Sequence, residues 1–311
     1  MLTATDLFAG AGGSSEGMRQ AGIDVRVCAN HWPRAVETHQ LNHPDTEHRL
    51  ADLSETDFRT FPRTDILWAS PSCVWHTPAG GRKRIPVADE LARTDPGAID
   101  RATAFAVIQA AEVHRYPVVL VENVPEFRSW TLYDWWLSGM AALGYTAQVQ
   151  VLDAADFGVP QSRKRLFIAF SLAGPLRLDH EPRRVPATVA LDAGGNYRRT
   201  TGGYVAPQLA QIDEDLVAHI VTYRKHARAR NAHRHPFATI TASRNHQHIA
   251  YRDRGEYWKR DLTTTEVSRA MGFPDTYQVG GTKAERQRQL GNAVPPPVAR
   301  FLAERAKEVL V

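Results

Sequence analysis

Short apolar runs alternate with stretches of helical spacing through the first half of the chain. The run from Val118 to Val121 is apolar at every position, as expected for a central strand that is covered on both faces. Strands are predicted at residues 2–8, 25–29, 65–69, 118–121, 147–152 and 165–170. Because strands alternate with helical stretches, we expect an α/β fold built on a doubly wound, mostly parallel sheet.

The helical stretches carry start signals of their own. Ser14 or Ser15 is the expected N-cap of the first helix, since short polar side chains bind the free N–H groups of a first turn. Thr263 followed by Glu266 resembles a capping box and predicts another helix start. Helices are predicted at residues 14–21, 33–41, 100–115 and 296–309.

The charge pattern changes after about Ser171. Residues 222–260 contain ten Lys or Arg and five His against two acidic residues, with aromatic side chains between them. A solvated basic surface is one interpretation, but aromatic rings among cations favour a nucleic-acid surface, because phosphates bind cations and bases stack on rings. The candidate DNA-binding residues are Arg224, Lys225, Arg228, Arg230, Arg234 and Arg244.

Composition narrows the class of protein. The 311 residues are 43% hydrophobic and 23% charged, which excludes wholesale disorder. The two cysteines, Cys28 and Cys73, are too few for a disulfide scaffold and are typical of a reducing compartment. Since no apolar stretch approaches the roughly 20 residues of a membrane span, we expect a cytoplasmic protein. Cys28 is expected to be buried.

Candidate reactive side chains lie at the ends of three of the predicted strands. A glycine-rich turn at 8–13 leaves the first strand, where backbone approaches a ligand closely. Cys73 follows the strand at 65–69, Glu122 ends the strand at 118–121, and an arginine pair, Arg163 and Arg165, begins the strand at 165–170. The sequence therefore places a thiol, a carboxylate and two cations at one edge of one sheet.

These motifs together resemble the DNA (cytosine-5)-methyltransferase family. The similar segments, in the family's order, are Asp6–Gly13, Pro71–Cys73, Glu122–Val124, Gln161–Arg165, Arg260–Asp275 and Gln289–Pro295. The resemblance implies a Rossmann-like methyltransferase fold and S-adenosyl-L-methionine as cofactor. It also implies three parts: a catalytic and cofactor-binding domain at 1–170, a target-recognition region at 171–258, and a segment at 259–311 that returns to the catalytic domain.

The resemblance also implies roles for individual residues. Cys73 would add to carbon 6 of a flipped-out cytosine, Glu122 would protonate ring nitrogen 3, and Arg165 with Arg163 would bind the base's carbonyl oxygen. Asn123 would shape the loop. The cofactor residues implied are Phe8, Ala9, Gly10, Gly12, Gly13, His31, Trp32, Asp52, Asn292 and Val294.

Two positions depart from the family's pattern. Ser72 precedes the nucleophile where the family has proline, and His31 stands where the family has a ribose-binding glutamate. The first change leaves open a non-catalytic DNA-binding relative, and the fold leaves open an RNA (tRNA) cytosine-5 methyltransferase. We expect double-stranded DNA as partner, a monomeric enzyme associated with the nucleoid of a bacterial or phage-infected cell, and a cognate restriction endonuclease as a further candidate partner.

Overall fold

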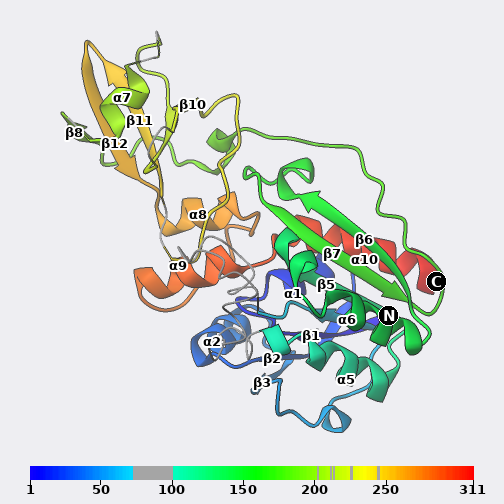
Figure 1. The fold of residues 1–311 in the computed structure, drawn as a ribbon. Coiled ribbons are helices and arrows are strands. Elements are labelled where there is room, and N and C mark those ends of the chain that lie inside the picture. Colours follow the sequence, from blue (N-terminus) through cyan, green and yellow to red (C-terminus); the bar gives the residue numbers. More distant parts are fainter. Residues whose placement is uncertain (73–100, 202, 211, 213, 225–226, 244–245) are drawn as a thin grey trace, which may run out of the picture. The chain divides into compact units, whose positions relative to one another are not determined.

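The computed structural model describes residues 1–72, 101–201, 203–210, 212, 214–224, 227–243 and 246–311 (Figure 1). These residues divide into two compact units. The first unit comprises Met1–Leu152, Lys164–Asp179 and Ala299–Val311, and the second comprises Asp153–Arg163 and His180–Val298. The three-part division expected from the motifs stays a prediction, because the units are defined by contacts and not by function.

A seven-stranded sheet organises the described part of the first unit, in the order β3-β2-β1-β4-β5-β7-β6. The strands are β1 (Thr3–Leu7), β2 (Asp24–Asn30), β3 (Glu47–Leu50), β4 (Ile66–Ala69), β5 (Val118–Asn123), β6 (Thr146–Asp153) and β7 (Lys164–Ser171). β3, β2, β1, β4 and β5 run parallel, and β7 is antiparallel to β5. The predicted mostly parallel, doubly wound sheet is confirmed.

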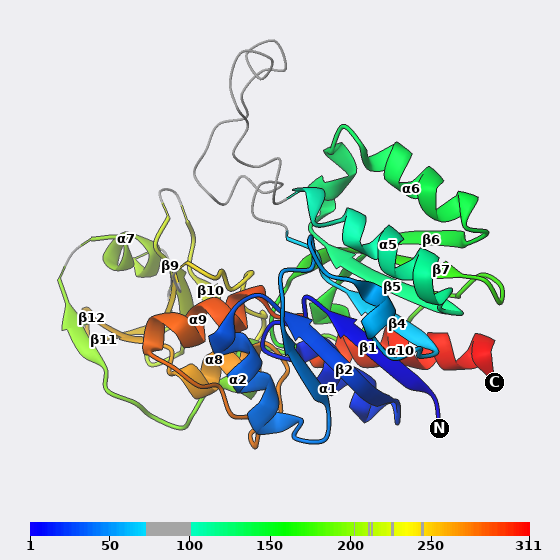
Figure 2. The same ribbon diagram turned by 90° about the horizontal axis from the view of Figure 1, so that it is seen from below.

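Helices cover both faces of this sheet (Figure 2). They are α1 (Gly13–Gln20), α2 (Pro33–Asn42), α5 (Phe105–His114), α6 (Tyr133–Ala142) and α10 (Pro296–Leu310). One buried apolar cluster joins β1, β2, β4, β5 and β7 to α5 and α6. On the other face, the Lys307 amine of α10 donates to the Ala21 carbonyl at the end of α1 at 2.7 Å. β5 is buried along its whole length, as its apolar pattern predicts.

Two details of the first unit differ from the sequence prediction. The N-cap of α1 is Gly12 in a left-handed conformation, not Ser14 or Ser15. Both serine hydroxyls instead donate to the buried Asp6 carboxylate. The helical stretch predicted at 100–115 is interrupted by a turn at 103–104, after which α5 begins at Phe105.

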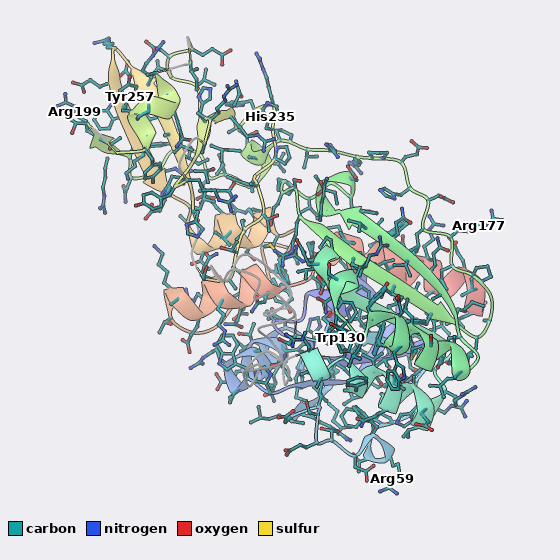
Figure 3. All side chains as sticks on the ribbon, viewed as in Figure 1. Arg59, Trp130, Arg177, Arg199, His235 and Tyr257 are labelled. Carbon is teal, nitrogen blue, oxygen red and sulfur yellow. The ribbon has the colours of Figure 1, made fainter. Side chains whose placement is uncertain are left out.

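The second unit holds a five-stranded antiparallel sheet in the order β10-β9-β11-β12-β8. Its strands are β8 (Arg198–Thr200), β9 (His219–Thr222), β10 (Arg230–Asn231), β11 (Gln247–Asp253) and β12 (Glu256–Asp261). Figure 3 shows Arg199 and Tyr257 on this sheet. No strands were predicted at 222–260, because the many charged residues of this segment hide the alternation of apolar and polar positions.

Three helices complete the described part of the second unit. They are α7 (Val205–Leu209), α8 (Thr264–Ala270) and α9 (Lys283–Asn292). The capping box of Thr263 and Glu266 at the start of α8 is confirmed. Short 3-10 turns lie at Phe58–Thr60 and Pro125–Ser129 in the first unit, and at Ala154–Asp156 and Ala187–Ala190 in the second.

A buried ion pair ties α8 to the sheet of the second unit. The Arg260 guanidinium donates to both oxygens of Glu266, at 2.7 and 2.8 Å. Burial raises the pKa of Glu266, but the bonds from Arg260 and from the backbone of Thr263 and Asp192 outweigh it, and the net pKa lies below its usual value. The carboxylate is therefore charged down to acidic pH.

Among the described residues, no helix is long and apolar enough to cross a membrane.

Candidate active site

The glycine-rich turn follows β1 at the carboxyl edge of the parallel strands. Phe8, Gly10 and Gly12 all adopt positive φ, at 61°, 55° and 86°. A left-handed Phe is costly, by about 1–3 kcal/mol, and persists only where its surroundings hold it. The Ala9 amide donates to the Ala29 carbonyl on β2, and the Gly12 amide to the Ala9 carbonyl. The turn at 8–13 is therefore a fixed loop rather than a loose connection.

The Asp6 carboxylate connects β1 to the first turn of α1, on the two sides of this loop. The side chain is fully buried, and one carboxylate oxygen accepts the hydroxyls of Ser14 and Ser15 at 2.6 and 2.7 Å. Burial raises the pKa of Asp6 to about 7, against the lowering effect of these serine bonds. Asp6 begins the first of the motifs identified in the sequence, but no role was predicted for it. Its position one residue before the end of β1 was the available signal.

The other predicted cofactor residues of the first unit lie at the ends of the next two strands. His31 is exposed and follows β2, and the amide of the half-buried Trp32 donates to Asn30 Oδ1. Asp52 is exposed, follows β3, and accepts the Ser54 amide. Because β1, β2 and β3 are parallel, their ends share one edge of the sheet. The structure therefore brings these residues to the edge that carries the glycine-rich turn.

Glu122 and Arg165 form an ion pair at the ends of two neighbouring strands. Arg165 Nε lies 3.2 Å from Glu122 Oε1, and both side chains are largely buried. Their strands, β5 and β7, pair antiparallel, so the end of β5 meets the start of β7. The pairing of the predicted acid with a predicted cation thus follows from sheet register.

The loop that leads to Cys73 is tied to the same strand end. The Asn123 side chain donates to the Pro71 carbonyl at 3.1 Å, which fits the predicted loop-shaping role of Asn123. The Ser72 amide donates to the Thr103 hydroxyl at 3.2 Å. Cys73 itself lies outside the described residues, and Pro71, two positions before it, is held at the end of Glu122's strand by the bond from Asn123.

Arg163 belongs to the second unit, although it is two residues from Arg165. Its guanidinium donates to the carbonyls of Ile240 at 3.0 Å and Gly291 at 2.8 Å, and the residue is 2% exposed. Gly291 is one residue from the end of α9, where carbonyls lack helical partners and a cation is favoured. Arg163 therefore connects its own segment to two others of the second unit, those that contain Ile240 and Gly291.

Asn292 and Val294 also belong to the second unit. Asn292 is the exposed last residue of α9, and Val294 is 5% exposed. The neighbouring Gln161 is fully buried; its amide donates to the Ala270 carbonyl, and its oxygen accepts the Ile240 amide. The motifs around 161 and 291 therefore meet inside one unit.

Three of the predicted DNA-binding arginines line one pocket of about 300 Å³ in the second unit. Arg224, Arg228 and Arg230 lie there, and all three are exposed. Arg234 is exposed and lies 3.6 Å from Glu214. Lys225 and Arg244 are outside the described residues. The remaining lining residues are Thr222, Ala227, Ala238, Thr239, His246 and Gln247.

The fold and the strand-end residues together define the Rossmann-like methyltransferase class. The sequence matches the family of C-5 cytosine-specific DNA methylases over residues 2–177 and 196–308, and the chain belongs to that family. It is therefore a DNA (cytosine-5-)-methyltransferase, as the motifs predicted.

Curated relatives agree with this assignment along the whole chain. The Type II methyltransferase M.HgiDI of Herpetosiphon aurantiacus is 31% identical, covering 96% of this chain and 92% of the relative. M.NlaX of Neisseria lactamica is 29% identical, covering 100% and 97%. Among solved structures, Entamoeba histolytica methyltransferase EhMeth has a TM-score of 0.74 at 14% identity, covering 100% of this chain and 99% of that chain. Dnmt2 methyltransferase of S. pombe has a TM-score of 0.72 at 16% identity, with the same coverage.

Proposed function

We propose that the chain transfers a methyl group from S-adenosyl-L-methionine to carbon 5 of a flipped-out cytosine, through a covalent adduct of Cys73. The observation that carries this proposal is the Glu122–Arg165 pair beside the loop that leads to Cys73. A thiolate that adds to carbon 6 needs a proton delivered to the ring as charge develops there. The protonated Glu122 carboxyl group would give its proton to ring nitrogen 3, and the Arg165 guanidinium would hold the resulting carboxylate in place.

The roles of the two ion-paired residues differ. Glu122 would contact ring nitrogen 3 and the amino group of cytosine, and Arg165 would hold the carboxyl group in place and bind the base's carbonyl oxygen. Asn123 acts through Pro71 and is a positioning residue. Arg163 donates to two backbone carbonyls, so we assign it to anchoring the second unit and assign base contact to Arg165.

The first unit offers a set of groups that suits S-adenosyl-L-methionine. The left-handed turn at 8–13 lets backbone approach the methionine portion closely. Trp32 offers an aromatic face for adenine, the exposed Asp52 carboxylate an acceptor for its amino group, and His31 an imidazole for a ribose hydroxyl. The bound cofactor would supply the electrophilic methyl group. Asn292 and Val294 stay predicted cofactor residues.

Residues 171–258 are the proposed target-recognition region, with double-stranded DNA as the ligand. The arginine-lined pocket at 222–247 supports this assignment, because clustered cations bind phosphates. The relatives are named Type II methyltransferases, which favours a cognate restriction endonuclease as a functional partner. A monomeric enzyme in the cytoplasm, associated with the nucleoid, fits the same role.

A trapping experiment tests the mechanism. Bisulfite sequencing of DNA from expressing cells first defines the methylated site, and a duplex with 5-fluorocytosine at that site is then incubated with protein and S-adenosyl-L-methionine. Because fluorine cannot leave as a proton does, the wild-type chain should stay covalently attached. Attachment should vanish in Cys73→Ser and slow by roughly 100-fold or more in Glu122→Gln, in line with the usual contribution of general acid catalysis.

The controls separate the alternatives. Glu112→Gln changes an exposed glutamate on α5 and should trap like wild type. A wild-type chain that methylates no DNA, or that methylates tRNA instead, contradicts the proposal. Trapping that persists in Cys73→Ser shows that another residue is the nucleophile.

A further inference from the structure

A row of polar side chains crosses three strands of the first unit beneath the glycine-rich turn. Asp6 on β1 is the register partner of Cys28 on β2, which is the register partner of His48 on β3. Partners in parallel strands project to the same face of a sheet. Asp6 and Cys28 are 0% and 2% exposed, so the row lies between the sheet and its helices. Polar groups buried in this way need partners that compensate for lost water.

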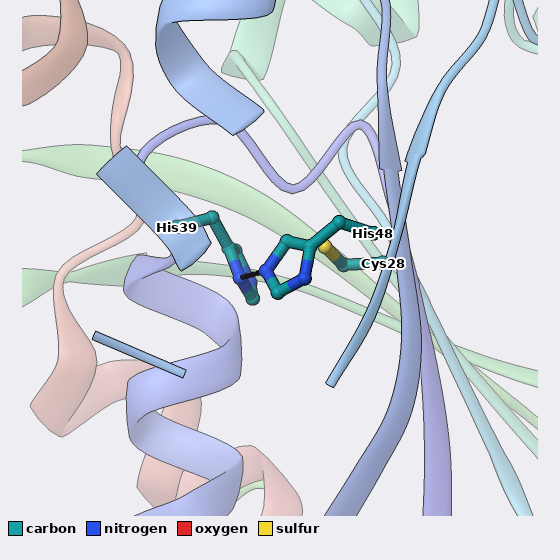
Figure 4. A group of neighbouring side chains, drawn as sticks. All are labelled: Cys28, His39 and His48. Carbon is teal, nitrogen blue, oxygen red and sulfur yellow. Dashed lines mark hydrogen bonds between the residues drawn. The ribbon is translucent and has the colours of Figure 1, made fainter. Parts of the chain in front are cut away.

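Two helices place further polar groups over this row. His39 of α2 lies with Nδ1 2.8 Å from His48 Nε2 and with Nε2 2.8 Å from the Ser15 hydroxyl of α1. The ligand atoms of Cys28, His39 and His48 all lie within 4.8 Å of one another. Figure 4 shows the Cys28 sulfur beside the two imidazole rings.

The hydrogen bonds of Ser15 indicate which nitrogen of His39 carries the proton. The Ser15 hydroxyl gives its only proton to Asp6 Oδ2, so Ser15 Oγ accepts a proton from His39 Nε2. The lone pair of His39 is then on Nδ1, which points toward His48. A metal-binding histidine is oriented in the same way, with its other nitrogen donating to an outer group that leads to a carboxylate.

The Asp6 carboxylate is a second observation that favours a cation at this place. Its Oδ1 is buried and has no hydrogen-bond partner among the described residues. An ionised carboxylate in such a place is stabilised by a nearby positive charge. The two positive charges of a divalent ion would balance one thiolate and this carboxylate, so the buried space between the sheet and its helices would carry no net charge.

We propose that Cys28, His39 and His48 bind a divalent transition-metal ion, with Zn²⁺ as the ion that best suits one thiolate and two imidazoles. Asp6 orients His39 through Ser15 and balances the charge. On binding, the Cys28 thiol loses its proton to solvent, and the metal–sulfur bond takes its place. His48 moves its remaining ring proton to Nδ1 and offers Nε2.

The geometry requires only small side-chain shifts. With Zn–N bonds of about 2.0–2.1 Å, two nitrogens of a tetrahedral site lie roughly 3.3 Å apart, so the two rings separate by about 0.5 Å. Cys28 moves inward by up to about 1 Å, from Zn–S bonds of about 2.3 Å. The bound ion would join β2, β3 and α2. Its role would be structural, because it would join β2 to α2, the two elements between which Trp32 lies.

Metal analysis of the untagged, full-length chain tests the site. After incubation with Zn²⁺ and gel filtration, about one ion per chain should remain on wild type, as expected for three protein ligands. Cys28→Ser and His48→Ala should lower retention at least tenfold, and Cys73→Ser should retain the ion. Circular dichroism checks that each variant is folded.

Cobalt gives an independent readout that needs no variant. Co²⁺ added to wild type should produce a near-ultraviolet thiolate-to-metal charge-transfer band, which Zn²⁺ then displaces. Absence of this band and of retained zinc in the wild type overturns the proposal, whatever happens to the variants. Undiminished retention in a folded Cys28→Ser shows ordinary histidine binding and overturns it as well. Neither measurement depends on methyl transfer, so failure of the proposed mechanism is separately visible.

Discussion

Replacing Arg163 with methionine separates an anchoring arginine from a substrate-binding one. The change removes two hydrogen bonds from a buried cation, to the Ile240 and Gly291 carbonyls, while it keeps most of the side-chain volume. Bonds to charged groups contribute about 1.5–3 kcal/mol each, and relief of the buried charge offsets part of their loss. We expect a net loss of about 3 kcal/mol, which is on the order of 100-fold in the unfolding equilibrium of the second unit.

Urea unfolding followed by circular dichroism and tryptophan fluorescence measures this effect. Arg165→Met is the matched control. It removes one ion pair, whose side chains are 15% and 10% exposed, so it should cost less stability than the loss of the two hydrogen bonds of Arg163, yet it should abolish methyl transfer. The reasoning is refuted if Arg163→Met unfolds at the wild-type urea concentration and loses activity as Arg165→Met does. In that case Arg163 contacts substrate.

Three further predictions follow from other contacts. Glu266→Gln should cost about 3–5 kcal/mol at pH 7 by leaving Arg260 without its carboxylate. Because the pKa of Glu266 is lowered on folding, wild type should lose this advantage as pH falls below about 4.5, and urea midpoints that differ equally at pH 7 and pH 3 would contradict this. Gly291→Ala should destabilise the second unit, since a Cβ there would lie 2.4 Å from the Ala242 nitrogen; an unchanged melting temperature would show that the backbone yields freely. Arg228→Ala should flatten the slope of log DNA affinity against log salt by about 0.9, as for one lost phosphate contact, and an identical slope would place Arg228 away from DNA.

The sheet of the first unit could be predicted because its strands are long apolar runs. Val118–Val121 identified β5, and the end of that run identified Glu122 as a strand-end carboxylate. β3 was missed because its four residues, Glu47–Leu50, are half-buried or exposed and three are charged or histidine. An edge strand of this kind is specified by its neighbour β2 and not by its own pattern.

The different partners of Arg163 and Arg165 could not be predicted from the sequence. The two residues belong to one motif, and their different surroundings depend on carbonyls 77 and 128 positions away from Arg163. The prediction of Ser14 or Ser15 as the N-cap of α1 was wrong for a similar reason. Their preference for a helix start was visible, but the buried Asp6 that claims their hydroxyls was not.

If target specificity resides in residues 171–258, as proposed above, the way the second unit is assembled from separate segments affects how that specificity changes during evolution. The residues from 153 to 163 sit between two strands of the first unit in sequence, yet Gln161 and Arg163 bond to residues near 240, 270 and 291. A recognition region acquired from a relative would therefore arrive without its partners at 161 and 163. It would have to present a carbonyl to the resident Arg163 and an amide to the resident Gln161 before it could fold. Exchange between relatives would then depend on two side chains, Gln161 and Arg163, that need not touch DNA.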